Sequence, residues 1–313
     1  MTKSSRHQIK LFHTHFGYDL MGDQSIDQQP SKTAGFICFF RACANKEKNE
    51  KIRSPDYLAR IFFKGSDSLL LKFHRITLPI ARRRVPGTYE YVIARTKFFD
   101  DVFKEALVEN YPQIVFLGAG YDTRPYRFKE YMEQTEIFEL DVSTTQQIKR
   151  QYLEKSKIPI PRQLHFVPIN FNKEDLGEVL NEAGFRTNKK ALFIWEGVTE
   201  YLTPEAVDST LNFISKNSGN TVAFNYIYKS IIDGTYDYSG SKEMVKATSK
   251  SKEPYQFGIE EGKIEQFLNE RGFELVSHYA AEELEKEYLT TDDGSPFGKI
   301  SGYVCLVIAA TKT

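Results

Sequence analysis

The chain has 313 residues, enough for one large α/β domain with an appendage or for two modest domains. Its 42 basic and 42 acidic residues cancel, so no overall field attracts nucleic acid or an anionic membrane, and we expect neither as a partner. The cysteines, Cys38, Cys43 and Cys305, are odd in number and lack metal-ligand spacing, which predicts reduced thiols and no metal site. Residues 1–16 contain no apolar leader, and no run of about 18 apolar residues occurs, so we expect a cytoplasmic protein.

The first part of the chain contains short apolar patches broken by charges. Helical spacing appears around 34–44 and 56–63, so we expect a helical N-terminal cap over residues 1–90. The basic run 81–84 is expected to be a solvated or acid-paired helix face and not a phosphate site, because the chain has no net charge.

Strand patterns then alternate with helical patterns over residues 91–313. The expected strands are 113–117, 136–141, 164–169, 191–195, 221–225, 273–278 and 303–310. Ser143 with Gln146 predicts a capping box, and Thr203 with Pro204 predicts a second helix start. This alternation predicts an α/β fold with a doubly wound, mostly parallel seven-stranded sheet, and a site at the carboxyl ends of the strands.

One long connection follows the fifth expected strand. Residues 226–256 are rich in Tyr, Ser, Lys and Gly and show no clear period. A connection of this length inside a compact domain is usually functional. We therefore expect this excursion to form a lid over the site.

A glycine turn, Gly118-Ala119-Gly120, ends the first strand of this sheet. Glycines at this place let the backbone approach a nucleotide-like ligand closely. The dinucleotide fingerprint requires a third glycine where Thr123 stands, and the Gly-Lys-Ser/Thr of a phosphate-binding loop is also missing. An NAD-dependent oxidoreductase therefore remains only the less favoured alternative.

Two acids, Glu139 and Asp141, lie at the end of the second strand. A carboxylate at this place can accept hydrogen bonds from both ribose hydroxyls, whereas it would repel a phosphate. The pattern suggests a nucleoside without phosphates, such as S-adenosylmethionine. The alternative is that these acids cap the next helix or merely end a strand.

Five segments in a fixed order carry a family resemblance. They are 95–96 (RT), 117–128 (LGAGYDTRPYRF), 139–141 (ELD), 196–204 (EGVTEYLTP) and 253–258 (EPYQFG). The chain resembles, over roughly residues 30–310, the leucine carboxyl methyltransferase family, including its bacterial polyketide O-methyltransferase-like branch. The resemblance implies a Rossmann-like class I methyltransferase fold with S-adenosylmethionine as donor and S-adenosylhomocysteine as product.

The resemblance also implies roles for single residues. Arg95 would bind the methionyl carboxylate of the cofactor, and the turn 118–120 would approach its methionyl and ribose parts. Asp141 would take the ribose, with Glu139 as the alternative partner. Glu196 would lie near the methionyl amine or the sulfonium.

Further residues complete the expected site. Asn170 and Phe171 stand where the family has an acid and an aliphatic residue against the adenine. Arg41 would be either a second basic contact to the cofactor or a surface arginine. Tyr201 and Tyr226 are candidates for the wall of the acceptor site, although both could equally pack the lid.

The acceptor is expected to be an oxygen of a small molecule or a peptide. A carboxylate acceptor is already ionised at neutral pH, whereas a phenol would profit from a general base. No histidine lies in a site motif, which favours a carboxylate. Every motif binds cofactor, so a non-catalytic nucleoside-binding sensor or scaffold remains an alternative, and the oligomeric state stays open.

Overall fold

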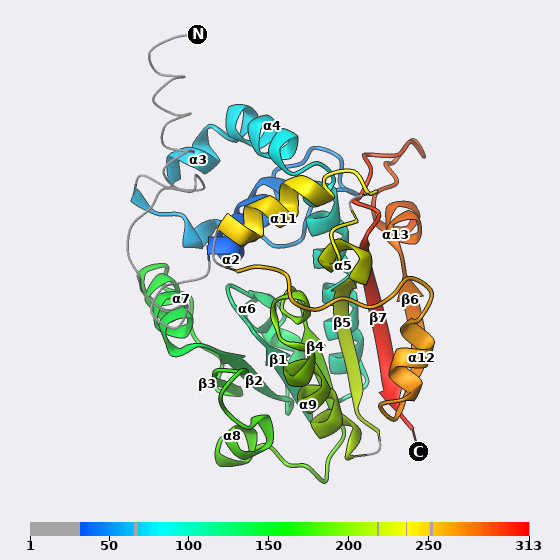
Figure 1. Cartoon of the computed structure of the whole chain (residues 1–313). Helices are drawn as coiled ribbons and strands as arrows, with labels where there is room; N and C mark the ends of the chain where they lie inside the picture. The colour runs from blue at the N-terminus through cyan, green and yellow to red at the C-terminus, as the bar shows by residue number, and fades with distance from the viewer. Residues whose placement is uncertain (1–31, 66–67, 218, 236, 251–252, 313) are drawn as a thin grey trace.

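The computed structural model describes residues 32–65, 68–217, 219–235, 237–250 and 253–312 (Figure 1). Residues 1–31 of the expected cap lie outside the described residues. The strands are β1 (Gln113–Leu117), β2 (Glu136–Asp141), β3 (Leu164–Pro168), β4 (Ala191–Trp195), β5 (Thr221–Ile227), β6 (Phe273–Tyr279) and β7 (Val304–Thr311). They form one sheet in the order β3-β2-β1-β4-β5-β7-β6, in which β7 runs antiparallel to its neighbours and the other pairs are parallel. The expected doubly wound, mostly parallel sheet is confirmed.

Helices cover both faces of this sheet and its carboxyl edge. The α-helices are α2 (Lys32–Ala44), α3 (Ser68–Lys72), α4 (His74–Arg84), α5 (Thr88–Val108), α6 (Arg124–Arg127), α7 (Ser143–Lys155), α8 (Leu176–Glu182), α9 (Pro204–Ser215), α10 (Lys229–Ile232), α11 (Ser241–Lys250), α12 (Ile264–Asn269) and α13 (Ala281–Tyr288). Short 3-10 turns are η2 (Ala59–Phe62), η4 (Lys129–Tyr131) and η5 (Thr199–Tyr201). Within the described residues, each helix is too short or too polar to span a membrane.

Helix α13 was not predicted, because it offers little apolar periodicity. It buries Ala281 and Leu284, and most of its other residues are charged. The segment 56–63 also differs from the prediction, since only a 3-10 turn forms there.

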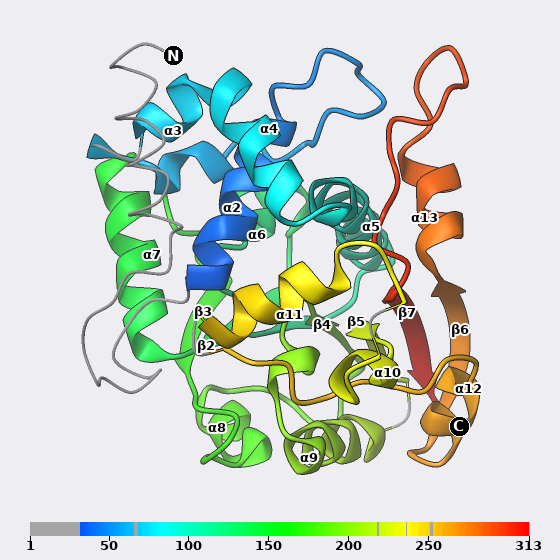
Figure 2. The ribbon, with the colours of Figure 1, turned by 45° about the horizontal axis from the view of Figure 1, so that its top comes forward.

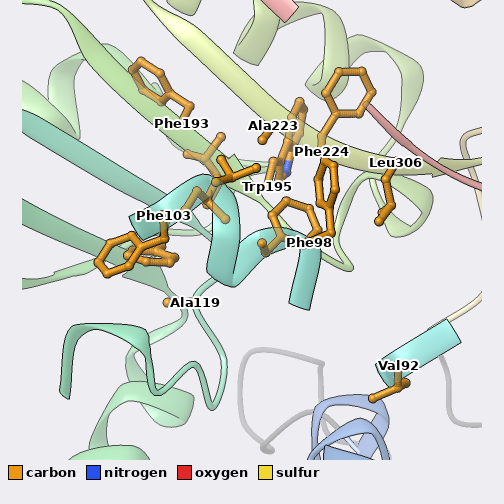
Figure 3. Close-up of a cluster of buried hydrophobic side chains, with 14 of the residues drawn as sticks. Val92, Phe98, Phe103, Ala119, Phe193, Trp195, Ala223, Phe224 and Leu306 are labelled. Carbon is orange, nitrogen blue, oxygen red and sulfur yellow. The ribbon is translucent and has the colours of Figure 1, made fainter. Parts of the chain in front are cut away.

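The core is built from aromatic and branched side chains on both sides of β4. Trp195 and Phe193 are fully buried, as expected for core residues. Figure 3 shows Trp195 beside Ala223 and Phe224 of the next strand. The three cysteines are buried free thiols, as predicted.

Two predicted helix starts had different outcomes. Thr203 does cap α9, because its Oγ1 accepts a hydrogen bond from the N–H of Ala206. The capping box at Ser143 was wrong. Ser143 is the first residue of α7 itself, and the side chain of Gln146 donates to the carbonyls of Glu139 and Val167 at 2.9 and 3.1 Å. Gln146 thus ties β2 to β3 and does not close a cap.

The N-terminal helices and part of the excursion lie together at the carboxyl edge of the parallel strands. In Figures 1 and 2, α11 crosses this edge beside α2. Strand β5 continues to Ile227, so the excursion starts later than expected, and it contains α10 and α11. The carboxylate of Glu253, after α11, accepts hydrogen bonds from the N–H and hydroxyl of Thr33 in α2. This contact closes the excursion against the N-terminal helix.

Candidate functional site

The glycine turn after β1 is held against the end of β2. Gly118 and Gly120 have φ angles of 75° and 46°, in the left-handed region that favours glycine. The N–H groups of Gly118 and Ala119 donate to the carbonyl of Leu140 at 2.9 and 2.8 Å. A Cβ on Gly118 would also collide with Val198, which follows β4. The turn therefore depends on glycine for both its conformation and its packing.

The two acids at the end of β2 have different surroundings. Asp141 lies at the partly exposed edge, where its oxygens accept from the N–H groups of Gly120 at 2.6 Å and Val142 at 2.7 Å. Glu139 is fully buried and forms an ion pair of 2.7 Å with Lys149 of α7. Burial raises the pKa of Glu139 to about 7, against the opposing effect of Lys149. Asp141 is thus the acid that lies at the edge beside the turn.

Arg95 and Glu196 meet at the end of β4. Arg95 projects from α5, and its Nε lies 2.9 Å from Oε1 of Glu196. A Cβ on Gly197 would lie 3.3 and 3.5 Å from the two terminal nitrogens of Arg95, so these nitrogens pass close to the backbone after β4. Glu196 uses Nε of Arg95, so the two terminal nitrogens are the pair that can bind a ligand carboxylate.

Glu196 is held from its other side by a buried arginine. Oε2 of Glu196 lies 2.8 Å from Nη1 of Arg124, whose Nε lies 2.8 Å from Asp100 and which also pairs with Asp122. Asp122 also accepts from the backbone N–H of Arg124 at 2.7 Å and so holds this arginine beside the turn. Asp100 in turn binds Arg127 through two contacts of 2.6 Å. This alternation of charges fixes the carboxylate of Glu196, and through it Arg95.

Arg41 of α2 is buried, with 8% of its surface exposed, so the alternative of a surface arginine was wrong. Its Nη2 donates to the carbonyl of Tyr121 at 2.6 Å, and its Nε lies 3.4 Å from Asp56. Asp56 also accepts from the hydroxyl of Thr123 at 2.7 Å. Arg41 and Asp56 thus join the N-terminal helices to the glycine turn.

Asn170 and Phe171 follow β3 at the same edge. The N–H of Ile169 donates to the carbonyl of Asp141 at 3.0 Å, so this loop continues directly beside β2. Oδ1 of Asn170 accepts from the N–H of Asn172 at 3.1 Å, and Phe171 packs partly buried against the core. Their predicted contact with adenine stays a prediction.

The two tyrosines proposed for the acceptor wall lie in different places. The ring of Tyr201 packs against Tyr255 of the returning excursion, with centroids 5.4 Å apart. Tyr226 is buried, and its hydroxyl hydrogen-bonds His278 of β6 at 3.0 Å. Asn225 points toward the turn after β4, and neighbouring side chains of a strand alternate between faces. Tyr226 therefore faces away from that turn, and we no longer assign it to the acceptor wall.

Sequence reasoning missed Asn225 and Glu200. Oδ1 of Asn225 accepts from the N–H of Gly197, and its Nδ2 donates to the carboxylate of Glu200 at 3.1 and 3.3 Å. A polar residue near the carboxyl end of an otherwise apolar strand was the available signal for Asn225. No comparable pattern marks Glu200, because its partner lies 25 positions away in the sequence. Among the described residues, no group of His, Cys, Asp and Glu is arranged to hold a metal ion.

Comparison with known proteins identifies the family. The family model described as leucine carboxyl methyltransferase matches residues 35–215, more than half of the chain. The chain belongs to the leucine carboxyl methyltransferase family. The match spans the glycine turn, both acids of β2 and the segment that follows β4.

Two curated relatives illustrate the similarity. The Bacillus subtilis protein named "Putative S-adenosyl-L-methionine-dependent methyltransferase YktD" is 30% identical over 194 residues, which are 61% of this chain and 64% of that protein. A protein of Mycolicibacterium paratuberculosis with the same general name is 30% identical over 58% of this chain and 60% of its own length. The chain thus matches a little under two thirds of the length of these relatives.

Two solved structures share the fold. A crystal structure of a DUF574 family protein from Streptomyces avermitilis covers 92% of this chain and all of that one, with a TM-score of 0.60 and 12% identity. That of a "putative methyltransferase" from Thermobifida fusca covers 82% of this chain and 95% of that one, with a TM-score of 0.55 and 15% identity. Together with the strand order, they show the class I methyltransferase fold.

Proposed function

We propose that this protein is an S-adenosylmethionine-dependent methyltransferase that acts on an oxygen atom, a carboxylate or a hydroxyl, of a small molecule or a peptide. The observation that carries the proposal is the pairing of two features at one edge of the sheet. Asp141 is joined to the glycine turn by a hydrogen bond of 2.6 Å, and the Arg95 guanidinium is held by Glu196 at the adjacent strand. The cofactor needs an acid that accepts hydrogen bonds from its ribose hydroxyls and an arginine that donates to its methionyl carboxylate.

The residues present fit the cofactor. The terminal nitrogens of Arg95 would bind its methionyl carboxylate, the turn 118–120 would lie along its methionyl and ribose parts, and Asp141 would accept from the ribose. Asn170 and Phe171 would border the adenine. Glu139 drops out of this set because its carboxylate is buried with Lys149.

Glu196 and Arg41 have a different part in this proposal. Both oxygens of Glu196 are already paired, with Arg95 and with Arg124, so Glu196 orients Arg95. Its negative charge would lie close to the cofactor amine or sulfonium. Arg41 holds the turn through the carbonyl of Tyr121. Each therefore shapes the site mainly through another residue.

When bound, S-adenosylmethionine supplies an electrophilic methyl group on a sulfonium. The protein's task is to orient an acceptor oxygen in line with that group and to exclude water. The excursion, which is fastened to α2 through Glu253 and to η5 through Gln256, would form the cover over the acceptor.

Transfer of a labelled methyl group tests the proposal. The purified chain is incubated with S-adenosylmethionine labelled on the methyl carbon and with fractions of small molecules and peptides. We expect a labelled O-methyl product together with S-adenosylhomocysteine. Binding of S-adenosylhomocysteine without transfer to any fraction would instead support a sensor or scaffold.

A further inference from the structure

Glu200 differs from the other buried acids of the described chain in its partners. It is 5% exposed, and its carboxylate accepts from the hydroxyl of Thr199 at 3.2 Å and from the amide of Asn225. The other buried acids each form an ion pair with an arginine or a lysine: Asp56, Glu90, Asp100, Asp122 and Glu139. Among the described residues, Glu200 has no such cation. Its hydrogen-bond partners are neutral, and the charge of Arg95 acts on it without an ion-pair contact. A buried carboxylate without an ion pair is costly, which makes Glu200 a candidate for a functional role.

The surroundings of Glu200 are largely aromatic hydroxyls. The groups that interact electrostatically with it come from several elements: Tyr91 and Arg95 of α5, Tyr201 of η5, Tyr255 of the returning excursion and Tyr303 just before β7. Glu253 also faces Tyr201. Tyr201 and Tyr255 are partly exposed, so this group of tyrosines reaches the molecular surface.

Glu200 lies on the lid side of the carboxyl edge. Asp141 ends β2 and the glycine turn follows β1, whereas Glu200 follows β4 and is bound to Asn225 of β5. Its backbone carbonyl accepts from the N–H groups of Gln256 and Phe257, where the excursion returns to the core. Glu200 thus lies where β4, β5 and the returning excursion meet, which is the side that the proposed function gives to the acceptor.

We propose that Glu200 is the general base for a hydroxyl acceptor, so that the substrate is a neutral aromatic molecule that carries a hydroxyl group and is not a carboxylate. This inference rests on the proposed methyltransferase function. The acceptor O–H proton passes to the Glu200 carboxylate, and an oxygen lone pair forms the new O–C bond to the methyl carbon. The S–C bond breaks with its electron pair going to sulfur. The products are a methyl ether, S-adenosylhomocysteine and protonated Glu200, which releases its proton to water.

The negative charge of Glu200 discriminates between a carboxylate acceptor and a hydroxyl acceptor. An acceptor carboxylate would meet the Glu200 carboxylate in a site of low dielectric, where like charges repel strongly. A hydroxyl would instead donate a hydrogen bond to it. Burial raises the pKa of Glu200, opposed by Arg95, Thr199 and Asn225, and a base with a raised pKa accepts a phenolic proton more readily.

Binding to the S-adenosylhomocysteine complex tests the proposal without turnover. Isothermal titration calorimetry compares 4-methylphenol with 4-methylbenzoate on the wild type, on Glu200→Gln and on the exposed control Glu205→Gln. We expect the wild type and the control to bind the phenol at least tenfold more tightly than the benzoate, and Glu200→Gln to lose this preference. A wild type that shows no preference for the phenol, or a Glu200→Gln variant that keeps the preference, overturns the proposal. Failure of S-adenosylhomocysteine to bind the wild type would instead overturn the proposed function.

Methyl transfer provides the second readout. Loss of a general base typically costs 10²–10⁴-fold, so Glu200→Gln should lower kcat/KM for 4-methylphenol by ~100-fold or more. The loss should be much smaller for 4-nitrophenol, which ionises without a base. Equal losses for both phenols would indicate a structural role and overturn the proposal, as would a methyl ester formed from the benzoate. Weaker binding of S-adenosylmethionine but not of S-adenosylhomocysteine would assign Glu200 to the sulfonium and also overturn it.

Discussion

Asp141 of β2 accepts a hydrogen bond of 2.6 Å from the backbone N–H of Gly120, across two neighbouring strands. The acid and the glycine turn are therefore one unit, and a ligand that touches one of them also meets the other. Burial raises the pKa of Asp141, while the N–H groups of Gly120 and Val142 oppose this effect. A bound nucleoside can take the remaining acceptor capacity of this carboxylate.

S-adenosylhomocysteine should raise the melting temperature of the protein, and NAD should not. The turn has Thr123 in place of the third glycine of a dinucleotide site, whereas the ribose acid and Arg95 are present. Ligand at 100 times its dissociation constant adds about 2.7 kcal/mol to the free energy of unfolding. Differential scanning fluorimetry with both ligands measures this difference, and stabilisation by NAD alone would contradict the assignment of the cofactor.

Asp141→Ala should weaken S-adenosylhomocysteine binding about ten- to a hundredfold, because charge-assisted hydrogen bonds to the ribose are lost. Glu139→Gln should change this affinity far less, since Glu139 is buried with Lys149. Calorimetric titration of both variants decides between the two acids. A larger loss of affinity for Glu139→Gln than for Asp141→Ala would make Glu139 the partner of the ribose.

The pH dependence of stability should carry a contribution from Glu139. Its pKa is raised from 4.5 to about 7 by burial, so the folded state binds the proton more tightly than the unfolded state does. This favourable contribution is complete below about pH 4.5 and is lost as the pH rises through about 7, by up to ~3 kcal/mol.

Urea unfolding of the wild type and of Glu139→Gln between pH 5 and pH 8 measures this contribution. The variant carries a neutral side chain at every pH, so its stability should fall less steeply with pH than that of the wild type. Glu205→Gln, on an exposed turn of α9, should keep the slope of the wild type. Parallel slopes for all three proteins would show that Glu139 does not titrate in this range.

Arg95→Ala should weaken S-adenosylhomocysteine binding about ten- to a hundredfold, which corresponds to roughly 1.5–3 kcal/mol. Its effect on folding should be smaller, because Glu196 keeps its ion pair with Arg124. Arg271→Ala is the matched control, since this arginine pairs with Asp208 on α9 at the surface. Normal cofactor binding by Arg95→Ala would make Arg95 a structural residue.

Much of the sheet could be predicted because its strands are short apolar runs with clear ends. The turn 118–120 and Asp141 were found for the same reason, since each follows directly on such a run. Prediction from the local pattern failed where a side chain binds a partner from elsewhere in the fold. Gln146 looks like half of a capping box, yet its amide binds two strand carbonyls that a single sequence does not reveal.

The rest of the site depends on partners that are distant in the sequence. Tyr226 hydrogen-bonds His278, which lies 52 positions further along the chain. Arg95 pairs with Glu196, which lies 101 positions further along. The first contact removes Tyr226 from the expected acceptor wall, and the second explains how Arg95 is held in place. Glu200 was missed because its neutral hydrogen-bond partners, and the lack of an ion pair among the described residues, become visible only when its neighbours in space are known.

Replacement of residues 233–249 by a short Gly/Ser linker should abolish methyl transfer while S-adenosylhomocysteine binding stays within about tenfold. The removed segment holds most of α11, which lies at the carboxyl edge beside α2 (Figure 2). The proposed cofactor contacts lie in other segments, and the linker leaves Glu253 free to bind Thr33 and Gln256 free to bind Tyr201. A Gly/Ser replacement of the exposed turn 291–295 controls for the general effect of a linker. Calorimetry and labelled methyl transfer separate the two functions, and turnover that survives the replacement would mean that the excursion does not form the acceptor site.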